Sequence, residues 1–380
     1  MVDWTLLPDE LLDLILQKLS RVVDFLRSSV VCKSWYSVAR QNKTKRQAVP
    51  MLLVPTPDNK EDKRSLYSVA KNQIYDFQLN IPSNKRLAGS SQGWVVLADK
   101  CLTSKGKLNL TLLNPFSGKT IYLPPVALSR DPHLYPENFE LLIVLTDMHR
   151  LVLYKSSEKS WIYIKDHPKL GMYFADVIFY EDKFYFVDLR MGLGRIDVVE
   201  SSNNSNIPTD HGCDAGVSSL TPRIELVSKC VYGWLDPELK NTHKNYIVET
   251  SSGDLILVQR YLKVLKADSI SYQLVTFDFK LHKLQSSSWI PIDSLGDDVL
   301  FLGDNHSMSV SALQFPECQR NCIYYSDDQF DPFEYEYDGP DDIGVYDLTN
   351  RSTKLCYIPD PENKHMPPPI WILPILQGYQ

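Results

Sequence analysis

Hydrophobic and polar positions follow two different patterns in this chain, and the pattern changes near residue 45. Over residues 8–19, leucine and isoleucine recur at spacings of three and four residues, which predicts an amphipathic α-helix. A proline and two acidic residues open this segment, as is typical of a helix N-terminus. The pattern predicts two more short helices, over residues 24–30 and 32–40.

The first predicted helix carries more apolar surface than one neighbour can cover. At roughly 100° per residue, its apolar side chains span an arc of about 200°, whereas a one-sided surface helix has a stripe of about 100°. These side chains are Leu11, Leu12, Leu14, Ile15, Leu16 and Leu19. A second apolar face follows, where Val31, Trp35 and Val38 recur at helical spacing.

After residue 45 the chain consists of short β-branched and aromatic runs bounded by Gly, Pro, Asn, Asp and Ser, which predicts strands and turns. The clearest hairpin signal is the polar turn after residue 250. The predicted strands cover 108–112, 141–145, 151–154, 177–180, 184–187, 246–250, 255–258, 274–279, 299–302, 323–325 and 344–347.

This all-β region is large for one sandwich, so a β-propeller is favoured over a sandwich or barrel. Its roughly 335 residues, divided by a repeat of about 40–50, give about seven or eight blades, although no clean internal repeat is visible. The polar stretches 56–65, 201–219 and 327–342 are expected to be loops or insertions. The proline-rich stretch 359–369 should be extended before Trp371 returns to a packed environment.

Charge and composition exclude several classes of protein. The net charge of −7 leaves no basic footprint for nucleic acid. No apolar run reaches the roughly 18 residues of a membrane helix, and the N-terminus does not have the pattern of a secretory signal. Seven scattered cysteines suit reduced thiols, and hence the cytoplasm or the nucleus.

No motif indicates an enzyme, a metal site or a cofactor. Cys318 and Cys322 have no second ligand pair at a suitable spacing, and neither do His211 and Cys213. Nucleophile-elbow, Walker and His-Glu-x-x-His motifs are absent. The acidic residues of 327–342 do not have the spacing of an EF-hand, so a solvated loop is favoured over a calcium site or a surface that contacts a basic partner.

The N-terminal block closely resembles the F-box. The resemblance rests on Leu6-x-Pro8-Asp9-Glu10-Leu11-Leu12 and on Val31-Cys32-Lys33-x-Trp35, and covers roughly residues 4–40. The F-box family docks onto a Skp-type adaptor and so joins its carrier to a cullin scaffold. That role would explain the wide apolar arc, with one edge packed inside the three-helix unit and the other in the adaptor. A helical cap on the β domain is the alternative.

The resemblance also implies which residues contact the adaptor. The expected contacts are Leu6, Pro8, Leu11, Ile15, Val31 and Trp35. Leu12, Leu16 and Val38 are expected inside the unit, and Trp4 is expected to be a peripheral anchor. For Trp35, core packing remains an equal alternative.

The rest of the chain resembles the C-terminal domain of a plant group of F-box proteins, described as kelch-like β-propellers of unknown function. The matching segments are SQGW at 91–94, LNPFSG at 113–118, SLGD at 294–297, NCIYY at 321–325 and PPPIW at 367–371. We therefore predict an F-box domain of three helices at residues 1–45, followed by a propeller of about seven blades at residues 46–380.

The function implied by this resemblance is that of a substrate-recognition subunit of a Skp–cullin–F-box ubiquitin ligase. Its expected partners are a Skp-type adaptor, through it a cullin, and an unknown protein substrate, with no nucleic acid, membrane or cofactor. The alternatives are an F-box protein that regulates a partner without ubiquitin transfer, and an enzyme on a propeller scaffold.

Overall fold

The computed structural model describes most of the two predicted regions. The described residues are 7–19, 22–29, 31–41, 49–56, 63–82, 84–99, 107–126, 133–138, 141–145, 151–155, 159–164, 174–200, 220–228, 242–267, 272–304, 306–328, 342–358 and 368–374. The predicted insertion 201–219 therefore lies outside them, with His211 and Cys213. So do Trp4, Leu6 and most of the stretches 327–342 and 359–369.

The helices of the N-terminal block lie close to the predicted positions. They are α1 (Asp9–Lys18), α2 (Val22–Ser29) and α3 (Lys33–Gln41). The backbone N–H groups of Leu11 and Leu12 both donate to the Pro8 carbonyl at 3.1 Å, so Pro8 caps α1 from outside the helix. No helix among the described residues is long and apolar enough to cross a membrane.

The strands form six sheets in the described part of the chain, five of four strands and one of five. The first two sheets are β25-β1-β2-β3, from Ile370–Ile372, Met51–Pro55, Lys63–Ser68 and Gln73–Asn80, and β4-β5-β6-β7, from Lys85–Ser91, Trp94–Asp99, Leu110–Leu113 and Thr120–Tyr122. The next two are β8-β9-β10-β11, from His133–Asn138, Leu141–Leu145, Leu151–Lys155 and Ser160–Tyr163, and β12-β13-β14-β15, from Phe174–Tyr180, Lys183–Asp188, Leu193–Glu200 and Leu220–Ser228. The last two are β16-β17-β18-β19, from Thr242–Glu249, Leu255–Ala267, Tyr272–Gln285 and Ser288–Ile292, and β21-β20-β22-β23-β24, from Met308–Ser311, Asp298–Leu302, Cys322–Tyr325, Gly344–Asp347 and Ser352–Leu355.

The predicted blade count of about seven is wrong, because the described strands form six sheets. The division by a repeat length assumed blades of equal size. Strands β17 and β18 contain 13 and 14 residues, more than twice the usual strand length of about 5–6 residues, so one blade uses much more chain than the average. The predicted loop at 56–65 is also partly wrong, because β2 begins at Lys63.

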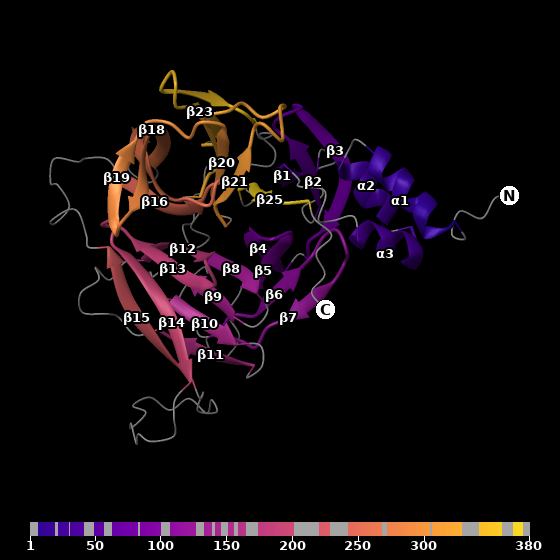
Figure 1. The fold of residues 1–380 in the computed structure, drawn as a ribbon, viewed down its shortest axis with the longest axis horizontal. Helices are drawn as coiled ribbons and strands as arrows, with labels where there is room; N and C mark the ends of the chain where they lie inside the picture. Colours follow the sequence, from indigo (N-terminus) through magenta and orange to yellow (C-terminus); the bar gives the residue numbers. More distant parts are fainter. Residues whose placement is uncertain are drawn as a thin grey trace.

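The sheets are arranged around a common centre as propeller blades (Figure 1). The first strands of successive sheets contact one another, from β25 to β4, β8, β12, β16 and β21. The ring is closed by β25, which comes from the C-terminal end and pairs antiparallel with β1. Helices α1, α2 and α3 lie outside the ring, on the side of β2 and β3 (Figure 1).

Turns were predicted well where a side chain stabilises them. Asn114 Oδ1 accepts the backbone N–H groups of Phe116 and Ser117 at 3.0 and 2.9 Å, and Gly118 adopts a φ of +70°. The hairpin after residue 250 is also confirmed, since Thr250 N–H donates to the Asp254 carbonyl at 2.9 Å.

Trp371 joins the closing strand to the neighbouring sheet, as its predicted packed environment implied. Its side chain is fully buried, its ring packs edge-on against Phe301 at 5.1 Å, and its Nε1–H donates to the Leu302 carbonyl at 3.0 Å. The last blade is therefore held to the first by an aromatic contact and a buried hydrogen bond.

Replacing Trp371 by phenylalanine should lower the free energy of unfolding by about 1–2 kcal/mol. The Leu302 carbonyl would keep only the Ser326 N–H as a donor, and the smaller ring would leave part of a fully buried site unfilled. Urea denaturation of the full chain measures this change. Trp161→Phe is the matched control, since Trp161 also donates to a carbonyl, that of Pro124, but is only half-buried. Equal losses in the two variants would contradict this role for Trp371.

The helices and the propeller share one hydrophobic cluster. It contains Leu12, Leu16 and Val38 of the helices together with Leu53 of β1 and Leu97 of β5. Burial of Leu12, Leu16 and Val38 was predicted and is confirmed. The helical block is thus packed on the edge of the propeller next to β1–β3 and β4–β5, and one edge of its apolar arc is used there.

Candidate partner-binding surfaces

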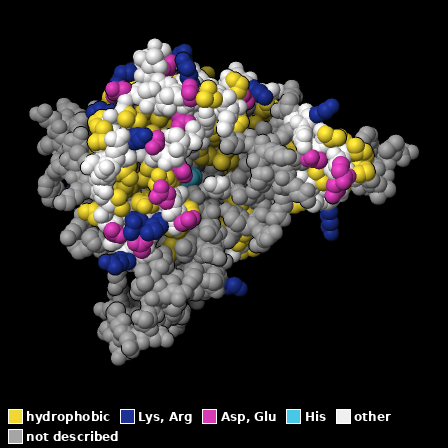
Figure 2. Space-filling model, viewed as in Figure 1, with side chains coloured by type: hydrophobic (Ala, Val, Ile, Leu, Met, Phe, Trp, Pro, Cys, Tyr) yellow, Lys and Arg dark blue, Asp and Glu magenta, His cyan; other side chains and the backbone are white. Residues whose placement is uncertain are grey.

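The other edge of the apolar arc is exposed to solvent. Leu11 and Leu14 of α1 are 47 and 53 % exposed, and Val31, just before α3, is 57 % exposed. Leu11 and Leu14 are three residues apart and share a helix face. We call Pro8, Leu11, Leu14 and Val31 the helical apolar face. Figure 2 shows hydrophobic atoms in yellow beside acidic ones over the helices.

The start of α3 is held beside the start of α1. Ser34 Oγ donates to Asp9 Oδ1 at 3.3 Å. This contact brings Val31, three residues before Ser34, to the same end of the block as Pro8 and Leu11. Because half-exposed leucines and a valine gather at this end without cover from the described chain, the surface is suited to a protein partner.

The six predicted adaptor contacts differ in how exposed they are to solvent. Pro8, Leu11 and Val31 are exposed, and Leu6 lies outside the described residues. Ile15 is half-buried and packs against the cluster shared with the propeller. Trp35 is only 8 % exposed and belongs to that cluster, so a direct contact through its ring remains a prediction.

Leu14 was missed as a candidate contact. It was counted in the apolar arc but not assigned to either edge. Its spacing from Leu11, together with the expected burial of Leu12 and Leu16 on the opposite edge, is the signal that places it on the exposed edge.

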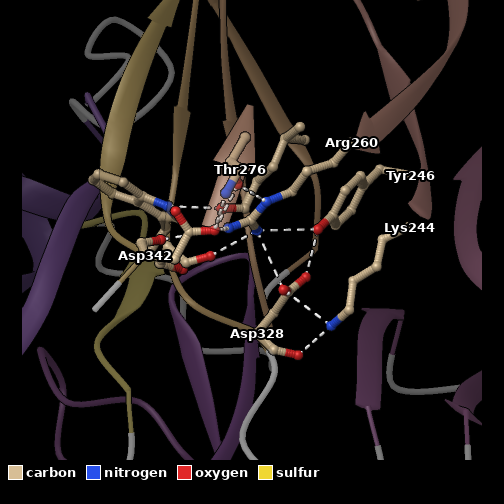
Figure 3. A network of polar contacts seen from close by, with 9 residues as sticks. Lys244, Tyr246, Arg260, Thr276, Asp328 and Asp342 are labelled. Atoms are coloured by element: carbon tan, nitrogen blue, oxygen red, sulfur yellow. Dashed lines mark hydrogen bonds and ion pairs between the residues drawn. The ribbon is translucent and has the colours of Figure 1, made fainter. Parts of the chain in front are cut away.

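A second notable feature is an arginine buried between two blades (Figure 3). The side chain of Arg260, on β17, is 0 % exposed and forms ion pairs with Asp328 at 3.2 Å and Asp342 at 2.7 Å. Its Nε–H donates to Thr276 Oγ1 at 2.7 Å, and one Nη–H donates to the Ser326 carbonyl at 2.9 Å. We call this group the Arg260 clamp.

The carboxylates of the clamp have further donors. Asp328 accepts the Tyr246 hydroxyl at 2.5 Å and pairs with Lys244 at 3.0 Å. Asp342 accepts both the backbone N–H and the hydroxyl of Thr276, at 2.9 and 2.6 Å. Each buried charge thus has charged and neutral partners, which is the condition under which a buried ion pair is tolerated.

The clamp corrects one sequence prediction. Asp328 and Asp342 were expected in a solvated acidic loop, but both are buried. Their partners on β16, β17 and β18 are distant in sequence, so no local pattern revealed them. Asp328 is bound to β16 and β17, and Asp342 is bound to β17 and β18.

The charges of the clamp are stabilised by one another. Burial alone would raise the pKa of Asp328, but the Lys244 and Arg260 cations lower it to about 2. Burial alone would likewise lower the pKa of the Arg260 guanidinium, but its neighbours raise it well above the usual value. Asp328 and Arg260 are consequently both charged at neutral pH.

This arrangement predicts a dependence of stability on pH. The pKa of Asp328 is lower in the folded chain than in the unfolded chain, so its contribution is present above about pH 4 and is lost as the pH falls toward 2. The shift from 3.8 to about 2 corresponds to about 2 kcal/mol. Urea denaturation measures the unfolding free energies of the native chain and of Asp328→Asn. The difference between the two values should shrink as the pH falls from about 4 toward 2. A constant difference would contradict the assignment.

Burial keeps two of the described cysteines in the neutral thiol form at neutral pH. Cys32, Cys318, Cys322 and Cys356 are free, and burial raises the pKa of Cys318 and Cys322 to about 12. Both of these thiols stay protonated, and a thiolate is what metal binding requires. No group of three or more metal-ligating side chains occurs among the described residues.

Comparisons with known proteins match two family models to separate parts of the chain. Residues 4–47 match the F-box-like family model, and residues 66–347 match the model described as KIB1-4 beta-propeller. The chain is 24 % identical to the F-box protein SKIP23 of Arabidopsis thaliana, over 98 % of this chain and 96 % of that protein. It is also 24 % identical to the F-box protein At2g17036 of Arabidopsis thaliana, over 98 and 95 %. The kelch-like character predicted from the sequence stays a prediction.

Solved structures resemble the chain only distantly. A quinonprotein alcohol dehydrogenase-like protein from Bacteroides thetaiotaomicron is 11 % identical and has a TM-score of 0.39, over 86 % of this chain and 78 % of that one. At this level the likeness supports no conclusion about function.

Proposed function

Because this chain belongs to the KIB1-4 β-propeller family and also carries an F-box-like domain, we propose that it is a substrate-recognition subunit of a Skp–cullin–F-box ubiquitin ligase. The observation that carries the proposal is the exposure of Leu11, Leu14 and Val31 on a block whose other edge is already buried. An apolar helix face of this kind enters a hydrophobic groove on its partner.

The proposed adaptor contacts combine the sequence prediction with the geometry. They are Leu6, Pro8, Leu11, Ile15, Val31 and Trp35, with Leu14 added. Among these, Leu11, Leu14 and Val31 would lose most solvent exposure on binding, and Trp35 would support them from the core. The proposed domains are an F-box at residues 1–45 and the propeller at residues 46–380.

The proposed mechanism requires no bond chemistry from this chain. The helical block binds the Skp-type adaptor, which binds the cullin, while the propeller holds a protein substrate. The substrate is thereby kept near a ubiquitin-charged conjugating enzyme, and its effective concentration there increases. The ligase acts in the cytoplasm or the nucleus.

The test is affinity capture with the proteasome inhibited, followed by mass spectrometry. The native chain is compared with Leu11→Asp combined with Val31→Asp. Proteins that accumulate on the variant, and that carry ubiquitin only with the native chain, are the substrates. Partners with the same ubiquitination in both samples would contradict the ligase function and favour regulation without ubiquitin transfer.

A further inference from the structure

The sheet that holds the Arg260 clamp has a distinctive second feature. His243, Tyr261 and Phe277, on three adjacent strands, form a row of rings. The His243 and Tyr261 rings stack at 5.9 Å, and Tyr261 meets Phe277 edge-on at 6.2 Å. All three side chains are half-buried, so part of each ring is open to solvent.

Two exposed lysines lie over these rings. Lys280 Nζ is 4.8 Å from the Tyr261 ring centre, and Lys263 Nζ is 6.0 Å from that of Phe277. Both side chains are exposed, and no carboxylate of the described residues pairs with either ammonium. The nearby Asp278 is already compensated, since it pairs with Arg351 at 2.8 Å and accepts the Tyr346 hydroxyl at 2.6 Å.

The Arg260 clamp holds this surface in place. Tyr261 follows Arg260, and Phe277 follows Thr276. His243 precedes Lys244, and its Nε2 lies 3.2 Å from the Leu189 carbonyl oxygen. Because each ring is adjacent in sequence to a clamp residue, the row is anchored before any partner arrives, which reduces the entropy lost on binding.

We propose that His243, Tyr261, Lys263, Phe277 and Lys280 form a basic–aromatic face that binds an acidic, aromatic-containing segment of the protein captured by the propeller. The inference rests on the proposed function, because it names the chemistry of the substrate. Carboxylates or phosphates on the segment pair with the lysines, and its side-chain rings pack on the exposed parts of Tyr261 and Phe277.

A nucleic acid is a poorer fit than a peptide. A phosphate backbone requires a continuous track of cations, whereas this face presents two lysines on a chain whose net charge is −7. A short segment with a few negative charges matches two lysines without repulsion from the rest of the surface.

The test uses fluorescence anisotropy with the full chain and a labelled peptide of alternating Glu and Tyr. The peptide should bind at about 50 mM salt and weaken as salt approaches about 0.5 M. Lys263→Gln combined with Lys280→Gln should weaken binding at least tenfold. Lys71→Gln combined with Lys159→Gln changes the charge equally at exposed positions in other sheets and should leave binding unchanged.

A second peptide, with Gln for Glu and phosphotyrosine for Tyr, tells which source of negative charge is preferred. Three results would overturn the proposal. The first is equal binding of the peptide by the two lysine double variants, and the second is no binding of the peptide to the native chain. The third is tighter binding of polyuridylic acid than of the peptide through the same lysines.

Adaptor binding is measured separately. Peptide binding that depends on Lys263 and Lys280, in a chain that does not bind the adaptor, would refute the ligase function and leave this face standing.

Discussion

Replacing Arg260 by methionine is expected to destabilise the folded chain by about 3–5 kcal/mol. Methionine has a similar length and fits an apolar environment, so the loss comes from charge and not from a cavity. Asp328 and Asp342 would remain buried without the guanidinium that contacts both. Lys244 would still pair with Asp328, which keeps the expected loss within this range.

Urea denaturation of the full chain measures this loss. The matched control is Arg320→Met, because Arg320 is 77 % exposed and forms one long ion pair of 3.8 Å with Asp297. Its substitution should change the unfolding free energy by less than about 0.5 kcal/mol. Adding Asp328→Asn and Asp342→Asn to Arg260→Met should recover part of the stability. Similar values for Arg260→Met and Arg320→Met would refute the clamp.

Substituting aspartate for both Leu11 and Val31 is expected to weaken binding to a Skp-type adaptor at least 100-fold. Each change places a carboxylate where the proposed interface removes water, and an unpaired buried charge is costly. The fold should be preserved, because both side chains are about half exposed in the free chain.

Surface plasmon resonance with an immobilised adaptor measures this effect. Leu313→Asp combined with Leu355→Asp is the control, because these residues are 76 and 66 % exposed on the propeller, far along the chain from the helices. The control should bind like the native chain. If the two double variants bind equally well, the helical apolar face is not the interface.

Much of the fold could be predicted because its signals are local. Residues 141–145 form β9 with the predicted bounds, since a short apolar run between polar stretches has few alternatives. The turn at Asn114 followed from side-chain capping within three residues. The three helices followed from their apolar spacing, with ends that shifted by one or two residues.

The rest depends on contacts between distant residues. Nothing in the sequence around Arg260 marks it as buried, because its partners Asp328 and Asp342 lie 68 and 82 residues away. The blade count was missed for a similar reason, since the extra length of β17 and β18 is set by their pairing with each other. Leu14 is a different case, because its spacing from Leu11, on the face away from Leu12 and Leu16, is a local signal for the exposed edge.

The central claim is that the helical apolar face is half of an interface with a Skp-type adaptor. Sedimentation velocity of the native full chain mixed with a purified Skp-type adaptor tests it most directly. We predict a stable one-to-one complex at micromolar concentration, and its loss when Leu11 and Val31 are both changed to aspartate. Separate sedimentation of the native chain and the adaptor would contradict the account.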